Sequence, residues 1–182
     1  MTFYEPLTKT EISKVKEIID NLLESDVTTD IIKERILIKI IGKRNEIYLV
    51  SSSDISFFDF ISSNPTIRDC NVAHAKIKIG FFIHEKFLMS IESLTFLAPL
   101  TNRKIFLSDR ETQRFVYGKD IKVVSNHLHE QISDLKEDKM VIVFSPNDIP
   151  LGYAKIRSRA NYIWLQNVVD IGIYLRSEKS AF

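Results

Sequence analysis

The 182-residue chain has 45% hydrophobic residues, 27% charged residues and a formal net charge of +1. This composition is typical of a globular protein and excludes an intrinsically disordered or polycationic chain. Cys70 is the single cysteine, which excludes an internal disulfide and an all-cysteine zinc site. The apolar runs of the chain are shorter than a membrane-spanning helix, which needs about 18 residues. The N-terminus does not have the form of a signal peptide. We therefore expect a soluble intracellular protein.

The first half of the chain predicts one long helix and two pairs of strands. Thr8–Glu11 has the spacing of a capping box, and apolar residues follow at helical spacing to about Glu24. A short helix is expected after Ser53-Asp54, and another at Glu92–Leu100. Strands are expected at Arg35–Ile41, Glu46–Val50, Ala75–Phe82 and Lys86–Ile91.

The second half predicts several short strands around one capped helix, which is typical of a small mixed β-barrel. Ser108 can cap a helix that ends at Gly118. His127–Ile132 alternates weakly in polarity. The stretch Met140–Tyr153, MVIVFSPNDIPLGY, predicts a buried strand, a turn and a returning strand. Further strands are expected at Lys104–Leu107, Ile121–Val124, Leu151–Arg157 and Tyr162–Gln166, with a closing helix or turn at Val168–Leu175.

Charge separates the two halves of the chain. Residues 1–98 carry 12 basic and 14 acidic residues, or −2, whereas residues 99–182 carry 13 and 10, or +3. A mildly basic C-terminal half is compatible with a partner that bears phosphates. We expect a domain boundary in the segment Glu92–Leu100.

The sequence contains no recognisable catalytic or metal-binding motif. His84-Glu85 begins like a zincin motif, but Leu88 stands where the second histidine belongs. His127 and His129 lie two residues apart and would share one face if they lie on a strand. Two surface histidines are a more common arrangement than a metal site. The glycines form no phosphate-binding loop, and the carboxylates form no evident acid–base pair. We therefore predict a protein that is not an enzyme and needs no cofactor and no metal.

A binding surface is the remaining candidate for function. Lys155, Arg157 and Arg159 alternate along one expected strand, so their side chains lie on one face. Such a row can contact successive phosphates, while neighbouring aromatic rings stack on unpaired bases. The plainer interpretation is the solvated outer face of a strand, and the side chain of Trp164 is expected in the core. The aromatic residues near the row are Tyr153, Tyr162 and Trp164.

Four segments resemble the Nip-seven family of ribosome-biogenesis factors, whose C-terminal half is a PUA domain. They are SLTFLAPL (Ser93–Leu100), RFVYGKDIKVVS (Arg114–Ser125), VIVFSPNDIPLGYA (Val141–Ala154) and DIGIYLR (Asp170–Arg176). The N-terminal stretches YEPLTKTE and NEIYLVSS also fit that family in order and spacing. The basic strand around Arg157 resembles the archaeal-type members.

This resemblance implies an α+β fold, with an N-terminal antiparallel β-sheet domain with helices (residues 1–92) and a C-terminal PUA pseudo-barrel (residues 93–182). It implies a non-catalytic RNA-binding factor in pre-rRNA processing and large ribosomal subunit biogenesis. The expected partners are single-stranded pre-rRNA, including U-rich RNA, and ribosome-assembly proteins that bind the N-terminal domain. We expect a monomer in the cytoplasm, or in the nucleolus for a eukaryotic member. Two alternatives remain: a PUA-bearing subunit or accessory of an RNA-modification enzyme, and a protein-interaction scaffold that has lost RNA binding.

We expect the RNA contacts to come from six basic residues of the C-terminal half. Two glycines would let the backbone and a ligand approach closely. The glycines are Gly118 and Gly152, and the basic residues are Lys155, Arg157, Arg159, Lys119, Lys122 and Arg176.

Overall fold

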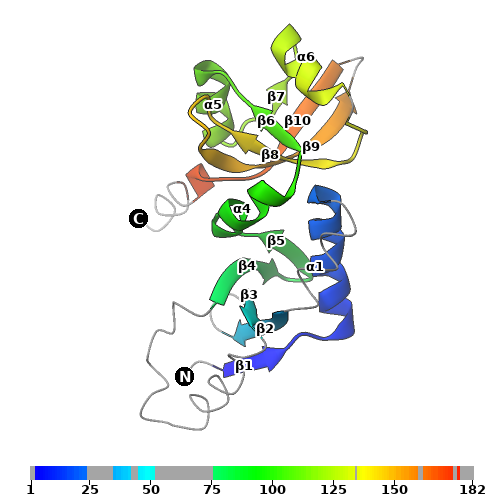
Figure 1. The fold of residues 1–182 in the computed structure, drawn as a ribbon, viewed down its shortest axis with the longest axis vertical. Coiled ribbons are helices and arrows are strands. Elements are labelled where there is room, and N and C mark those ends of the chain that lie inside the picture. Colours follow the sequence, from blue (N-terminus) through cyan, green and yellow to red (C-terminus); the bar gives the residue numbers. More distant parts are fainter. Residues whose placement is uncertain are drawn as a thin grey trace. The chain divides into compact units, whose positions relative to one another are not determined.

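The computed structural model describes residues 3–23, 35–41, 45–51, 76–133, 135–159, 162–173 and 176. The chain divides into two compact units (Figure 1). The first comprises Met1–Asp20 and Glu24–Ser93, and the second comprises Asn21–Leu23 and Leu94–Phe182. The helix expected after Ser53-Asp54 lies outside the described residues. Within the described part, every helix is too short or too polar to cross a membrane.

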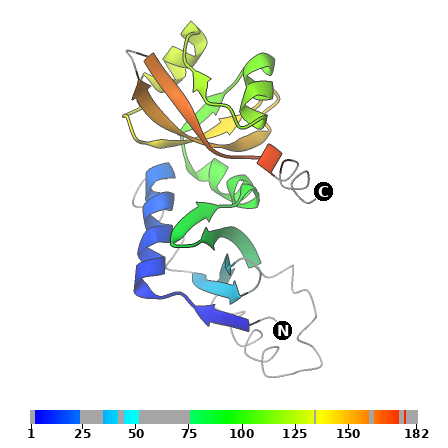
Figure 2. The same ribbon diagram turned by 180° about the vertical axis from the view of Figure 1, so that it is seen from behind.

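The first unit contains a five-stranded antiparallel sheet in the order β1-β2-β3-β4-β5 (Figure 2). The two predicted pairs of strands are confirmed and form hairpins, since β2 pairs with β3 and β4 pairs with β5 in antiparallel register. The strands are β1 (Phe3–Pro6), β2 (Arg35–Ile41), β3 (Asn45–Ser51), β4 (Lys76–Ile83) and β5 (Lys86–Met89).

Helix α1 (Lys9–Leu22) begins with the predicted capping box. The Thr8 backbone N–H donates to Glu11 Oε2 at 2.8 Å, and the Glu11 N–H donates to Thr8 Oγ1 at 3.3 Å. This reciprocal pair satisfies two N–H groups that have no partner inside the helix. Val15 and Ile19 are buried on one face of the helix.

The predicted helix at Glu92–Leu100 divides into two elements at a proline. Helix α4 (Ile91–Leu97) is followed by a 3-10 turn, η2 (Ala98–Leu100). Pro99 has no N–H to donate to the preceding turn, so the chain continues as a new tighter turn rather than as α-helix.

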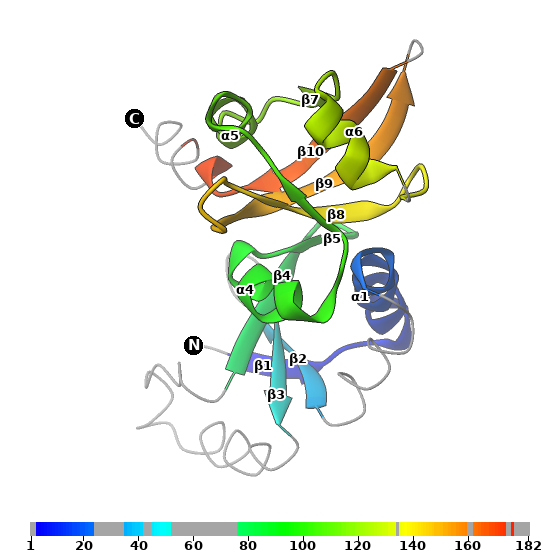
Figure 3. The same cartoon turned by 45° about the horizontal axis from the view of Figure 1, so that its top comes forward.

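The second unit contains a curled five-stranded sheet in the order β6-β8-β9-β10-β7 (Figure 3). β6 pairs with β8 in parallel, and the other neighbours are antiparallel. An α+β fold with an N-terminal antiparallel sheet and a C-terminal half-barrel is therefore confirmed. The elements are β6 (Lys104–Phe106), α5 (Asp109–Val116), β7 (Ile121–Lys122), α6 (Asn126–Ile132), β8 (Met140–Phe144), β9 (Pro150–Arg159) and β10 (Tyr162–Asp170).

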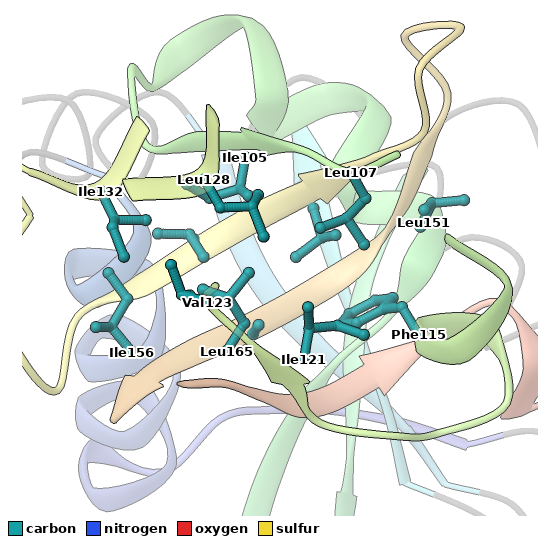
Figure 4. Packing of buried hydrophobic residues seen from close by; sticks show 13 residues of the cluster. Ile105, Leu107, Phe115, Ile121, Val123, Leu128, Ile132, Leu151, Ile156 and Leu165 are labelled. Atoms are coloured by element: carbon teal, nitrogen blue, oxygen red, sulfur yellow. The ribbon is translucent and has the colours of Figure 1, made fainter. Parts of the chain in front are cut away.

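The core of the second unit lies inside the curl of this sheet, and helices α5 and α6 and all five strands contribute residues to it (Figure 4). Phe115 from α5, Leu128 from α6 and Leu165 from β10 are fully buried there. The other buried members of this core are Ile105, Leu107, Ile121, Val123, Ile132, Val141, Val143, Leu151, Ala154 and Ile156.

The stretch Met140–Tyr153 forms the predicted strand, turn and strand. Ser145 organises the turn, because its Oγ accepts the N–H of Asn147 at 3.3 Å and the N–H of Ile149 at 3.2 Å. Pro150 stands at the first position of β9, where a strand tolerates proline best.

The weakly alternating stretch His127–Ile132 lies in helix α6, so the condition under which His127 and His129 would share a strand face is not met. Ser125 caps this helix through the N–H of Leu128 at 3.3 Å, and Leu128 and Ile132 lie four apart on its buried face.

The third strand of the sheet is longer than predicted. β10 continues through Val168 to Asp170, and the register of its pairing with β9 shifts between Asn167 and Val169. The bulge interrupts the alternation of polar and apolar residues, so alternation alone does not indicate that the strand continues past Gln166.

Candidate nucleic-acid interface

The three cations of β9 lie on one face of the curled sheet, as their spacing predicts. Ala154 and Ile156 point into the core from the opposite face. The side chains of Lys155, Arg157 and Arg159 are 28%, 37% and 52% exposed, so solvent access increases toward the end of the strand.

Antiparallel pairing places further polar and aromatic groups beside these cations. Lys155 lies opposite Gln166, Arg157 opposite Trp164, and Arg159 opposite Tyr162. Directly opposed residues of an antiparallel pair share one face of the sheet. We call this surface, formed by Lys155, Arg157, Arg159, Lys122, Tyr162, Trp164 and Gln166, the outer face.

Lys122 of β7 joins the outer face from the next strand, where it pairs with Trp164. Its Nζ lies 3.1 Å from the centroid of the Tyr162 ring, an arrangement in which the ring attracts the cation. Tyr162 is 49% exposed. A cation and an aromatic ring are thus available together at this end of the face.

Two aromatic residues occupy other positions than the sequence predicts. Trp164 lies on the outer face and is only partly buried, because its neighbours Ile163 and Leu165 take the core positions of β10. Tyr153 has the same parity as Lys155 but is only 1% exposed, so it offers no ring to a ligand.

Carboxylates flank the row of cations on both sides. Asp138, in the turn before β8, places its Oδ1 3.3 Å from Lys155 Nζ and also contacts Arg157 Nη1. Asp120, just before β7, lies 3.4 Å from Arg159 Nη1. The sequence alone does not reveal these partners. The pairing of β8 with β9 brings Asp138 to the row, and the pairing of β7 with β10 and of β10 with β9 brings Asp120 there.

Lys119 and Gly118 lie in the exposed loop between α5 and β7. Gly118 has a φ of 77°, and its N–H donates to Phe115 O at 2.9 Å, which ends the helix as predicted. A Cβ at this position would lie 3.3 Å from Arg176 Cζ. The close approach that Gly118 allows is therefore to a side chain of the same domain.

Gly152 also allows a close approach within the protein. A Cβ at this position would lie 2.0 Å from Val169 O of the paired strand β10. The missing side chain thus lets β9 and β10 cross closely beside the bulge.

Arg176 is held by an internal ion pair. Its Nη2 lies 2.7 Å from Asp170 Oδ2, its Nη1 lies 3.1 Å from Oδ1, and Nη1 donates to Val116 O at 2.6 Å. The carboxylate of Asp170 is 2% exposed and raises the pKa of Arg176. The structure thus brings Lys122 together with the cations of β9, while Arg176 is engaged beneath the end of α5.

Among the residues that the structure describes, no group of three histidine, cysteine or acidic side chains is arranged to hold a metal ion. His127 instead lies beside Gln131, with its Nε2 2.8 Å from Gln131 Nε2.

Residues 103–179 match the sequence model of the UPF0113 PUA domain. The 60S ribosome subunit biogenesis protein NIP7 of Saccharomyces cerevisiae is 36% identical over 105 residues, which cover 53% of this chain and 57% of the yeast protein. The NIP7 homolog of Danio rerio is 31% identical over 52% of this chain and 56% of its own length. These alignments span little more than half of each relative.

Two archaeal proteins are similar over nearly the whole chain. A UPF0113 protein of Archaeoglobus fulgidus is 26% identical over 99% of this chain and 98% of its own length. The crystal structure of a hypothetical protein from Pyrococcus horikoshii OT3 superimposes with a TM-score of 0.50 over 95% of this chain and 99% of that chain, at 9% identity, which shows a shared fold. The resemblance predicted from the sequence is confirmed by the matches in sequence.

Proposed function

The chain carries a UPF0113 PUA domain and resembles the Nip-seven family. We therefore propose that this protein is a non-catalytic RNA-binding factor that acts in pre-rRNA processing and large ribosomal subunit biogenesis. The relatives named as 60S ribosome subunit biogenesis proteins support the process. The observation that carries the RNA-binding part is the outer face, where four cations and two aromatic rings share one side of the sheet.

The spacing of the outer face suits a single strand of RNA. Side chains two residues apart on a strand are separated by roughly 6.7 Å, so successive cations of β9 can meet successive phosphates. Unpaired bases can then stack on exposed aromatic rings such as Tyr162, which double-stranded RNA does not permit. We therefore propose single-stranded pre-rRNA, including U-rich segments, as the ligand.

The N-terminal domain is proposed to bind ribosome-assembly proteins. Residues 1–98, which include this domain, carry a net charge of −2 and so lack the excess of cations that RNA binding favours. We propose that the protein acts as a monomer, in the cytoplasm of an archaeal-type host.

The double variant Arg157→Ala/Arg159→Ala tests the RNA site. It should bind single-stranded U-rich RNA more weakly, and each lost phosphate contact should reduce the slope of log affinity against log salt by about 0.7. The matched control is Arg110→Ala/Arg114→Ala, which removes two exposed cations from α5 of the same domain. Filter binding at several salt concentrations gives both quantities.

Equal losses in the two double variants would show that general charge, not the outer face, attracts RNA. Unchanged affinity and slope in Arg157→Ala/Arg159→Ala would refute the site. A wild-type protein that binds no RNA at either low or moderate salt would instead favour the scaffold that has lost RNA binding.

A further inference from the structure

We propose that the carboxylate of Asp138 competes with RNA phosphates for the cations of the outer face. It contacts these cations in the free protein, and a polyanion displaces it. This inference rests on the proposed function. Asp138 Oδ1 alone contacts two of the cations, lying 3.3 Å from Lys155 Nζ and against Arg157 Nη1. One anionic oxygen between an ammonium and a guanidinium is also the arrangement that a phosphate oxygen would take.

The backbone holds Asp138 in this place. Its N–H donates to Ile156 O at 2.9 Å, and the N–H of Ile156 donates back to Lys139 O at 3.0 Å. The turn thereby extends the pairing of β8 with β9 beyond Met140. The pairing of the two strands therefore places the carboxylate beside the cations. Asp138 has a φ of 68°, which allows the chain to turn at this point.

The contact is weak enough to be displaced. The side chain of Asp138 is 59% exposed and that of Arg157 is 37% exposed, and ion pairs with such access to water are worth little. RNA can offset the loss of this pair, because several phosphates bind along the row at once and release counterions. A small monoanion gains only one such contact, so Asp138 favours extended polyanions over single anions.

Arg157 does not need Asp138 for its orientation. Its Nε donates to Gln166 Oε1 at 3.2 Å on the neighbouring strand. Removal of the carboxylate therefore leaves the guanidinium positioned, with its Nη1 released toward solvent. This hydrogen bond decides the expected sign: the loss of Asp138 should strengthen RNA binding rather than disorder the site.

Asp120 has a different role, although it approaches Arg159. Its Oδ1 accepts the N–H of Asn167 at 3.0 Å, so it satisfies the backbone at the bulge of β10. Its removal would disturb the sheet, which makes Asp138 the residue that can be tested.

The test compares Asp138→Asn with Glu137→Gln in binding to a single-stranded U-rich RNA. Both variants remove one negative charge from the same turn. Glu137 accepts the backbone N–H of Ser158 at 2.9 Å, a bond that glutamine can keep, whereas Asp138 contacts the cations. Asparagine also tolerates the positive φ at position 138. We expect Asp138→Asn to raise the affinity about two- to five-fold and Glu137→Gln to raise it less.

A double-mutant cycle with Arg157→Ala makes the test specific. If Asp138 acts through the cations, the gain from Asp138→Asn should shrink when Arg157 is already absent. Equal gains in Asp138→Asn and Glu137→Gln, a gain that persists undiminished with Arg157→Ala, or a loss of affinity in Asp138→Asn would each overturn the inference.

The same data separate this inference from the proposed function. In one outcome, the wild-type protein binds RNA with an affinity that Arg157→Ala/Arg159→Ala lowers and Asp138→Asn leaves unchanged. That result would support the RNA site and refute the competition by Asp138. If neither the wild-type protein nor Asp138→Asn binds RNA, the proposed function fails and the competitor fails with it.

Discussion

At the scale of single residues, the guanidinium of Arg176 is held by contacts inside its own domain, which makes a structural role testable against the predicted role in RNA binding. It forms two contacts with the carboxylate of Asp170, at 2.7 and 3.1 Å, and donates to Val116 O. Gly172 makes room for this cluster, because a Cβ there would lie 2.0 Å from Val116 O. The arrangement ties the chain after β10 to the end of α5.

Arg176→Met should therefore destabilise the protein. The substitution removes both contacts of the guanidinium with the carboxylate of Asp170, which is 2% exposed. The Gly172 N–H, which donates to Asp170 Oδ1 at 2.8 Å, remains. Removing one partner of a buried ion pair costs about 3–5 kcal/mol, and the 41% exposure of Arg176 places this case at or below the lower end. Urea unfolding measures the change.

RNA binding by folded Arg176→Met supplies the complementary result. An unchanged free energy of unfolding together with weakened RNA binding would assign Arg176 to the RNA site, as the sequence suggested. A destabilised protein with unchanged affinity would assign it to the fold.

At the scale of the elements, α6 closes one edge of the curled sheet through a single side chain. Gln131 Oε1 accepts the N–H of Phe106 at 2.6 Å, and Gln131 Nε2 donates to Phe106 O at 3.1 Å. The amide of the side chain thus pairs with β6 as a neighbouring strand would. Leu128 and Ile132 anchor the same helix in the core.

Gln131→Ala should lower the free energy of unfolding by about 1–3 kcal/mol, because it deprives two backbone groups of a partner. His129→Ala is the control, since His129 is an exposed residue of the same helix. Hydrogen exchange should also become faster at the Phe106 amide in Gln131→Ala alone. The same stability in both variants would show that the apolar contacts of α6 suffice to hold it on β6.

The elements that the sequence predicted correctly have strong local signals. The helix after Thr8 follows from its capping box, and the turn after Phe144 follows from Ser145 and Pro150. Helix α6 is only seven residues long, too short for its periodicity to be distinct. The end of β10 was missed because the bulge at Asn167 changes the parity of the strand.

The candidate site was predictable in part. Alternation placed Lys155, Arg157 and Arg159 on one face, since that depends only on spacing within one strand. The position of Trp164 on this face depends on which side of β10 the core occupies. The apolar residues before and after it in the sequence, Ile163 and Leu165, were the signal that could have placed it there. The approach of Asp138 depends on long-range register, which one sequence does not reveal.

At the scale of the whole molecule, we propose that RNA binds the C-terminal domain and that protein partners bind the N-terminal domain. The distribution of charge supports this division, with −2 for residues 1–98 and +3 for residues 99–182. The excess is small, and carboxylates neutralise part of the outer face, so binding should depend on a local row of cations rather than on the charge of the whole protein.

Crosslinking of the full-length protein to RNA in its own cells tests the central proposal most directly. The crosslinked RNA is sequenced, and the crosslinked peptides are mapped on the protein, in parallel for the wild type and Arg157→Ala/Arg159→Ala. We predict precursor RNA of the large ribosomal subunit, crosslinked at β9 and β10 and depleted in the double variant. Enrichment of transfer RNA or messenger RNA, or crosslinks that the double variant leaves unchanged, would contradict the account.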